Sequence, residues 1–416
     1  MDDRPRNLKA MLSEAKDTSE LMVDLGYAAL FFADGRMADE VLRLEERLNE
    51  LVHEMREVCV LAGRSKRDAE QIAGVLHVVS AIERMGNAAV DISRVVTHRL
   101  GIPAALLADL AAAEEVSHRV RVREGSRLAG RRLEDVDLPM DVGMRIVALR
   151  RGREWTIDPD GEDLMLADDV LILRGARDGI DELRELAGAP AWVPAAVEEN
   201  PAISDLDRAV DVLVEMKNVS EAAVGLAYSA LLFNDQGLAA EVTQLEDRLD
   251  EMREQLELWV LRAGAETIDP SPLRGLLHLG GASEEIGDAA QQLVWLVEQE
   301  EEMHPVLAVA LGETDDVVVR FPIAAGAALD SALVGGRRLG DDTGFHLLAI
   351  RRGGRYLYRP RSRTALQGGD EILATGPWEG RAALADQCGF RLVADDDTGQ
   401  VALVPAATAP QPTAQR

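Results

Sequence analysis

The chain has 416 residues and a formal net charge of −29, from 74 acidic and 45 basic side chains. A field of that sign repels phosphates, which argues against a protein that binds nucleic acid or membrane surfaces over its whole surface. Its two cysteines, Cys59 and Cys388, are too few and too far apart for a disulfide scaffold or a thiolate metal site. The first residues lack the apolar core of a signal peptide, and no run of about 18 apolar residues predicts a membrane span. These features predict a cytoplasmic protein.

The sequence contains one unit twice, at an offset of 201 residues. Lys16 aligns with Lys217 and His77 with His278, and the alignment needs no gap between residues 16 and 188 of the first copy. Such self-similarity indicates a duplication, so predictions for the first copy also apply to the second. Arginine is strongly preferred over lysine, because the only lysines are Lys9, Lys16, Lys66 and Lys217.

The first half of each unit predicts helices. Leu21, Leu25 and Phe32 mark a helix that ends near residues 34–35. From Met37 to Val58 the apolar positions alternate steps of four and three, as in a bundle helix. A third helix is predicted from about residue 68 to the Gly101–Pro103 region, and a short one over residues 104–114. At about 1.5 Å per residue these are long rods, so short turns between them predict an elongated antiparallel bundle.

The second half of each unit changes to a strand period. Val120 and Val122 alternate with arginines, which is typical of a strand with one face in water. Further strands are predicted at 144–149, 155–157 and 170–173, followed by a helix at 180–186. Each unit therefore ends in a small α+β domain.

The domain boundaries follow from these patterns and from the prolines between them. The prediction is a bundle at 8–114, an α+β domain at 115–188, a linker at 189–205, a bundle at 206–312, an α+β domain at 315–393 and a disordered tail at 394–416. The predicted fold class is multidomain, α and α+β, with two elongated antiparallel helical bundles that each precede a small α+β domain.

The helical half resembles the PhoU-like domain. The resemblance rests on three segments of the first copy, which read ELMVDLGYAALFF, LRLEERLNEL and ERMGNAA. The α+β half resembles the TrkA C-terminal domain, also called the RCK C-terminal domain. That likeness rests on the segments EGSRLAGRRLEDVDL, GMRIVALRRG and IDPDGEDLMLADDVLIL. Together the two resemblances cover nearly the whole chain, twice.

The resemblance implies a regulator of potassium or other cation transport that acts on a membrane transporter or channel. RCK C-terminal domains are typically dimeric ligand sensors, and some bind cyclic di-AMP. PhoU-like domains regulate phosphate uptake, and several bind a divalent metal through E/D-x-x-x-D motifs. No strand followed by G-x-G-x-x-G occurs, so the nucleotide-binding domain of full RCK proteins is not expected here, and neither is NAD or ATP.

Two acidic pairs fit the metal motif. Glu20 and Asp24, like Glu284 and Asp288, are four residues apart, so both carboxylates of a pair lie on one helix face and could bridge a hard cation. The equivalent pairs are broken, because Gly225 and Asn87 replace one acid in each. The alternative is a solvated helix surface. For His77 and His278, which lie in apolar stretches, packing competes with a ligand role.

A basic stretch in the second α+β domain stands out against the acidic chain. Residues 351–363 read RRGGRYLYRPRSR, whereas the equivalent residues 150–162 read RRGREWTIDPDGE. Three explanations remain open: an anion such as a cyclic dinucleotide, an acid-to-base pairing of the two α+β domains within one chain, or a solvated hairpin. The candidate ligand-binding side chains are Arg351, Arg352, Arg355, Arg359, Arg361 and Arg363.

The sequence carries no catalytic signature, so we do not expect an enzyme. The function we expect is a cytoplasmic, ligand-sensing regulator of cation transport, with potassium as the favoured ion and a membrane transporter or channel as partner. Alternatives are a metal-binding PhoU-like regulator of phosphate uptake and a ligand-free interaction scaffold. Nucleic acid is not an expected partner, whereas a homodimer or an intrachain pseudo-dimer is.

Overall fold

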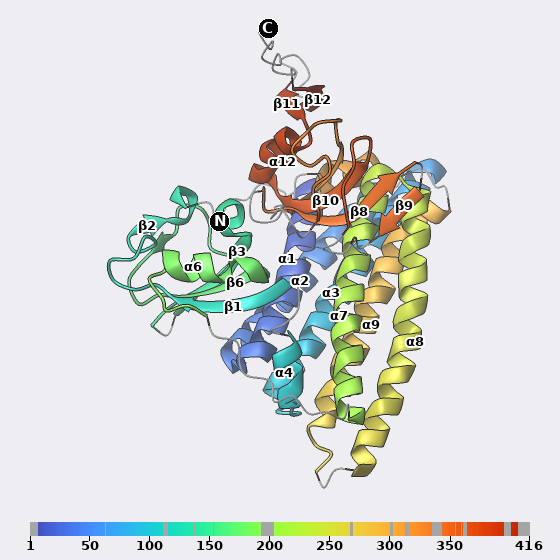
Figure 1. Ribbon diagram of the computed structural model, residues 1–416. Coiled ribbons are helices and arrows are strands. Elements are labelled where there is room, and N and C mark those ends of the chain that lie inside the picture. The colour runs from blue at the N-terminus through green and yellow to red at the C-terminus, as the bar shows by residue number, and fades with distance from the viewer. Residues whose placement is uncertain are drawn as a thin grey trace. The chain divides into compact units, whose positions relative to one another are not determined.

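The computed structural model describes 14 segments of the chain (Figure 1). They are 7–62, 64–110, 115–136, 138–152, 154–192, 204–266, 269–299, 303–312, 316–334, 343–353, 355–358, 360, 364–394 and 401–406. The chain divides into two compact units. The first unit comprises Met1–Leu138 and Met144–Asp315, and the second comprises Pro139–Gly143 and Asp316–Arg416.

The first helical bundle consists of α1 (Leu8–Phe32), α2 (Gly35–Ala62) and α3 (Lys66–Thr97), followed by the short α4 (Ala104–Leu110). The predicted helices are confirmed. The side chain of Asn7 caps α1 by accepting from the amide of Ala10, and Ser65 caps α3 by accepting from Asp68. Ala33 takes a left-handed conformation between α1 and α2, which ends α1 where the sequence predicted.

The second bundle repeats this order as α7 (Asp205–Phe233), α8 (Gln236–Glu266), α9 (Leu273–Glu298) and the short α10 (Pro305–Leu311). A capping box formed by Ser204 and Asp207 begins α7. Asn234, at the position equivalent to Ala33, is again left-handed. The first helix of each bundle therefore ends at equivalent positions, Phe32 and Phe233.

The two bundles pack against each other through α3 and α9 within the first unit. Gly74 on α3 lies against Leu296 near the end of α9, whereas Gly275 near the start of α9 lies against Gly101, just beyond α3. The two helices are therefore antiparallel. A side chain at Gly275 would collide with the Gly101 carbonyl, so glycine allows the close approach. In the same unit α4 packs on α7 and α10 on α1, so each short helix contacts the other bundle.

This pairing makes the helical part an intrachain pseudo-dimer. The predicted acid-to-base pairing of the two α+β domains is a separate hypothesis and stays a prediction. None of the helices in the described segments combines the length and apolarity that a bilayer span requires.

The first α+β domain contains a four-stranded antiparallel sheet in the order β1-β6-β3-β4. A second small ladder pairs β2 with β5. The elements are β1 (Glu115–Arg121), β2 (Arg131–Arg132), α5 (Leu138–Val142), β3 (Met144–Arg151), β4 (Glu154–Ile157), β5 (Leu164–Met165), β6 (Val170–Ala176) and α6 (Ile180–Leu186).

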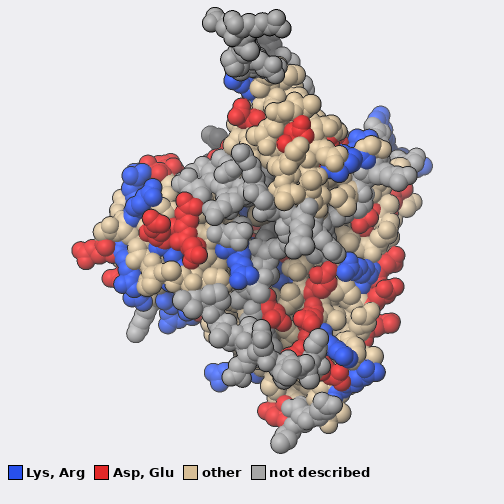
Figure 2. Space-filling view, in the orientation of Figure 1, with Lys and Arg blue, Asp and Glu red and all other residues tan. Residues whose placement is uncertain are grey.

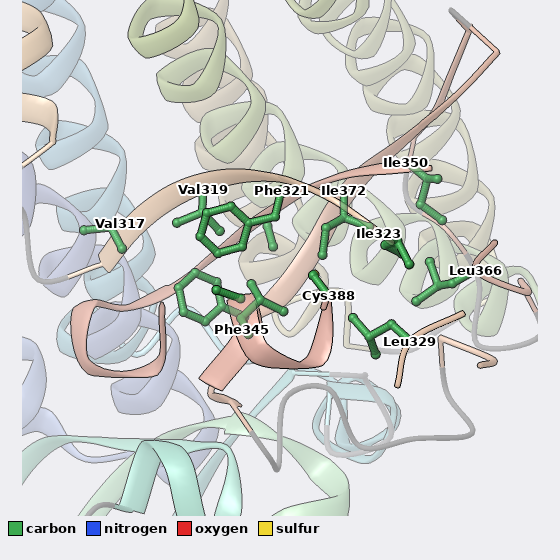
Figure 3. Packing of buried hydrophobic residues seen from close by; sticks show 13 residues of the cluster. Val317, Val319, Phe321, Ile323, Leu329, Phe345, Ile350, Leu366, Ile372 and Cys388 are labelled. Atoms are coloured by element: carbon green, nitrogen blue, oxygen red, sulfur yellow. The ribbon is translucent and has the colours of Figure 1, made fainter. Parts of the chain in front are cut away.

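The second α+β domain has the same strand order, β7-β10-β8-β9, as the duplication requires. Its elements are β7 (Asp316–Pro322), β8 (His346–Arg352), β9 (Arg355–Tyr358), β10 (Glu371–Pro377) and α12 (Arg381–Gln387). Figure 3 shows its core, in which Phe321, Phe345 and Ile372 pack with Cys388. Cys388 is buried and unpaired, and Cys59 is also a free buried thiol, as the sequence predicted.

The predicted disordered tail at 394–416 is wrong in part. A hairpin of β11 (Phe390–Ala394) and β12 (Val401–Pro405) follows α12 (Figure 1). Leu392 and Leu403, one from each strand, pack on the core of the second α+β domain. Apolar burial therefore orders this segment despite its prolines. Residues 395–400 and 407–416 lie outside the described segments.

Candidate functional site

A buried ionic cluster lies in the first unit, where two lysines at equivalent positions of the repeat are buried between the helices. Lys16 on α1 is 2.7 Å from the Glu20 carboxylate, and Lys217 on α7 is 2.7 Å from that of Glu221. Both pairs are four residues apart, which places the two side chains of each pair on one helix face. The lysines are only 4% and 7% exposed, so their charges depend on these carboxylates.

The two lysines also contact tyrosines of the opposite bundle. The Nζ atom of Lys16 lies 5.1 Å from the ring centre of Tyr228, and that of Lys217 lies 5.1 Å from the ring centre of Tyr27. These reciprocal cation–π contacts join α1 to α7. Burial, reinforced by nearby carboxylates, raises the pKa of both tyrosines, so their hydroxyls stay protonated. The Tyr27 hydroxyl lies 3.3 Å from the Ser283 hydroxyl of α9.

Arg174 on β6 connects the first α+β domain to both bundles. Its guanidinium pairs with Asp24 of α1, and Nη2 lies 3.1 Å from Oε1 of Glu221 on α7. Arg145, its partner in the β3–β6 register, lies 3.7 Å from Asp24. Burial alone would raise the pKa of Glu221, but Lys217 and Arg174 together hold it below its ordinary value. The two basic neighbours therefore favour the ionised form of the buried Glu221 carboxylate.

A cavity of about 20 Å³ lies beside these side chains. Its lining residues are Asp24, Tyr27, Phe31, Leu110, Val116, Ser117, Arg174, Lys217 and Glu221. That volume is enough for about one water molecule and too small for an organic ligand. The cluster is thus a connection between a sheet and two helices and not a pocket for a metabolite.

The second copy lacks this set of charges as a group. The residues equivalent to Asp24, Arg145 and Arg174 are Gly225, His346 and Thr375. The acid and both arginines that pair with it are therefore present together in one copy and replaced together in the other.

The structure gives each residue of the predicted metal pairs a basic partner. Glu20 pairs with Lys16 and Asp24 with Arg174, as described above. Glu284 lies 2.7 Å from Arg253, and Asp288 pairs with Arg84 of α3. In the described segments, no group of three or more histidine, cysteine or acidic side chains is placed to hold a metal ion. The metal assignment remains a prediction.

One acidic side chain near Asp288 was not singled out from the sequence. Glu246 on α8 is 9% exposed, and its Oε2 accepts a 2.8 Å hydrogen bond from Gln291. Burial, with the nearby charges of Asp250 and Asp288, raises the pKa of Glu246 to about 7. The neighbouring carboxylates of Asp250 and Asp288 thus disfavour the ionised form of Glu246.

The predicted basic stretch is only partly described. Arg352 makes a two-pronged ion pair with buried Asp370, at 2.7 and 2.6 Å, and Arg151 does the same with Asp169 at 2.9 and 2.7 Å. Because both copies keep this pair, Arg352 is committed to the fold. Arg351 lies 3.3 Å from Glu371, and Arg355 lies on β9. Arg359, Arg361 and Arg363 lie outside the described segments.

The two repeated histidines differ in environment. His77 on α3 stacks on Trp295 of α9, with ring centres 4.5 Å apart and an angle of 20° between the planes. It therefore packs at the contact between the bundles. His278 is exposed.

Lys16 and Lys217 were not singled out as site residues from the sequence, although their rarity and their equivalent positions could have indicated them. Four lysines among 45 basic residues make two of them at equivalent positions a rare coincidence. Lysine and arginine are not interchangeable at such a place, because lysine has a compact ammonium on a flexible stem and arginine a planar guanidinium. Lysine in an arginine-rich chain therefore indicated a specific site.

Comparisons with known proteins match three parts of the chain to family models. The family model for the PhoU domain matches residues 12–96 and 213–295, and the model for the TrkA-C domain matches residues 118–188. No curated protein sequence matches the chain significantly.

Solved structures give weaker matches. The crystal structure of PhoU from Pseudomonas aeruginosa is 16% identical, covers 70% of this chain and 93% of its own, and gives a TM-score of 0.36. The GsuK RCK domain is 16% identical, with coverages of 67% and 64% and a TM-score of 0.17. The GsuK channel bound to NAD is 14% identical, with coverages of 75% and 65% and a TM-score of 0.18. At these scores the matches do not establish a shared arrangement.

The domain content supports a regulatory, ligand-sensing role. It also agrees with the duplication seen in the sequence, because the PhoU matches fall on both copies of the helical half. The chain contains two PhoU domains, at residues 12–96 and 213–295, and a TrkA-C domain at residues 118–188.

Proposed function

We propose that this protein is a cytoplasmic regulator of potassium transport that senses a small ligand through its α+β domains. The helical bundles relay the ligand state to a membrane transporter or channel. The PhoU and TrkA-C domains support the regulatory part of this proposal. The proposal assigns no chemical reaction to the protein.

The observation that carries the relay is the position of Arg174. One side chain of the sheet pairs with Asp24 of the first bundle and with Glu221 of the second. Because Arg174 is only 22% exposed and both acids are largely buried, moving β6 would leave charges without partners. A change in the sheet is therefore coupled to the contact between α1 and α7.

The ligand we propose is cyclic di-AMP, an anion with two phosphates. Arginine forks suit phosphate oxygens, and the stretch 351–363 is rich in arginine. Arg352 is committed to Asp370, so the remaining candidates are Arg351, Arg355, Arg359, Arg361 and Arg363.

Titration calorimetry with cyclic di-AMP tests the ligand. The wild-type chain should bind, and Arg359→Glu/Arg361→Glu should not. Absence of binding by the wild type would remove this ligand from the proposal.

Hydrogen exchange tests the relay separately. Arg174 belongs to the first α+β domain, whereas the arginines proposed for cyclic di-AMP lie in the second, so the relay is tested without ligand. Arg174→Gln should speed the exchange of α1 and α7 relative to the wild type, because it breaks the ion pairs that hold the sheet to both helices. Arg132→Gln is a matched control in the same domain. The Arg132 side chain is 52% exposed, and within the described segments its ion pair is with Glu134. Equal exchange rates in the two variants would contradict the relay. Capture of a potassium transporter from native membrane extract would test the partner.

A metal-binding regulator of phosphate uptake is the second candidate. The mutual repulsion of the Glu246 and Asp288 carboxylates favours it, because a divalent cation would relieve that repulsion. Stoichiometric iron, zinc or magnesium in the purified protein, lost in Glu246→Gln, would support this candidate. A ligand-free scaffold would instead show no rise in melting temperature with any of these compounds.

A further inference from the structure

Large apolar side chains are exposed where the first helical hairpin ends. Val60 and Leu61, in the last turn of α2, are 76% and 79% exposed, although the neighbouring Cys59 is buried. Adjacent exposed leucine and valine at these fractions do not contribute to the bundle core. We call the described residues Val60, Leu61, Arg64, Lys66 and Arg67 together the first bundle tip.

Basic side chains follow directly. Arg64, Lys66 and Arg67 lie within four residues, and the Lys66 side chain is 91% exposed. The nearest acids in sequence lie farther along α3: Asp68 accepts from the backbone amide of Arg64, and Glu70 lies 3.4 Å from Lys66. The outermost part of the tip is thus positive on a chain whose net charge is −29. Acidic side chains instead gather along the α8 side of the helical part in Figure 2.

The second bundle provides an internal comparison. Leu261 is at the position equivalent to Val60 and is 71% exposed. The residues equivalent to the three basic ones are Ala265, Thr267 and Ile268. Both copies therefore expose an apolar side chain at this position. The first adds three basic residues, whereas residues 261–268 of the second contain one base, Arg262, and one acid, Glu266.

We propose that the first bundle tip docks on an anionic membrane surface. Val60 and Leu61 enter the boundary between headgroups and acyl chains, while Arg64, Lys66 and Arg67 contact phosphate-bearing headgroups. Charge complementarity favours this occupant, and the narrow end of a helical hairpin suits insertion into lipid better than contact with a flat protein surface. The rest of the chain does not prevent docking, because charges beyond about 8 Å are largely screened at physiological salt.

Vesicle flotation with the full-length chain tests the proposal. The probes are vesicles of phosphatidylcholine alone and vesicles with about a third phosphatidylglycerol. The wild type should bind the anionic vesicles and release them at high salt. Lys66→Ala/Arg67→Ala should weaken binding about 25-fold, on the scale of roughly fivefold for each basic residue near a membrane. Leu61→Asp should weaken it at least tenfold.

Leu261→Asp is the matched control, because it places the same change at the second tip, and its binding should equal that of the wild type. Thermal melts of all variants should coincide, since these side chains are exposed. Equal binding of the wild type to both vesicles, or none, would overturn the proposal, as would an equal loss in Leu261→Asp. Capture of an acidic protein in place of vesicles would also overturn it. The experiment needs neither ligand nor transporter, so it stands apart from the proposed function.

Discussion

Removal of Arg174 is the sharpest test of the ionic cluster. In Arg174→Ala, Asp24 keeps Arg145 at 3.7 Å as a basic neighbour among the described residues, and Glu221 keeps Lys217 at 2.7 Å. Breaking a buried ion pair costs about 3–5 kcal/mol when the remaining charge has no partner. Because each carboxylate retains one partner, we expect the free energy of unfolding to fall by about 2–3 kcal/mol in the transition that includes the first unit.

Denaturant unfolding measures this loss, and hydrogen exchange of α1 and α7 in the native state shows whether these two helices are the part that is weakened. The control, Arg132→Ala, removes an exposed pair and should cost less than about 1 kcal/mol. A double-mutant cycle with Asp24→Asn should give a coupling energy above about 0.5 kcal/mol. Equal stabilities for Arg174→Ala and the control would refute the reasoning, because the cluster would then contribute no more than a surface pair.

Three further predictions concern other parts of the fold. Burial and Arg184 lower the pKa of His118 from 6.5 to about 4, against a smaller opposing effect of Asp181. The free energy of unfolding should therefore fall by about 3 kcal/mol as the pH falls from 6.5 to 4, because the unfolded chain binds the proton more readily. In His118→Gln, unfolding curves measured across this range should lack this pH dependence. Gly275→Ala should destabilise the contact of α9 with the first bundle, because its Cβ would collide with the Gly101 carbonyl. Gly281→Ala on the same helix has open space around it and should stabilise the fold by about 0.5–1 kcal/mol. Thermal melts that rank the two variants in the opposite order would contradict this packing. Arg352→Ala should lower the free energy of unfolding by about 3 kcal/mol, because it leaves buried Asp370 without its two-pronged partner. Arg351→Ala should lower it far less. Equal melting temperatures of the two variants would show that the Arg352–Asp370 pair does not stabilise the fold.

The elements of the bundles could be predicted because their signals are local. Residues 37–58 carry the four-three spacing of one helix, and Asp34–Gly35 gave the turn before it. The tail was predicted less well, because the strand at 401–405 depends on packing of Leu403 against a core that is distant in sequence. Proline content alone does not report such packing.

The candidate site was predicted only in part. Glu20 and Asp24 were selected for their spacing, which placed them correctly on one face of α1. Their partners could not be inferred, because Arg174 follows Asp24 by 150 residues and reaches it only when β6 lies against α1. A carboxylate pair that could bridge a cation is, in the structure, paired with lysine and arginine.

The sequence by itself determined the duplication, the order of the bundle helices and of the main strands, and the resemblance to PhoU and TrkA-C domains, because these depend on spacing along the chain. The tertiary structure alone decided that Lys16 meets Tyr228 and that one arginine of the sheet reaches both bundles. Those contacts join residues far apart in sequence, and their strength comes from burial, which only the folded chain creates.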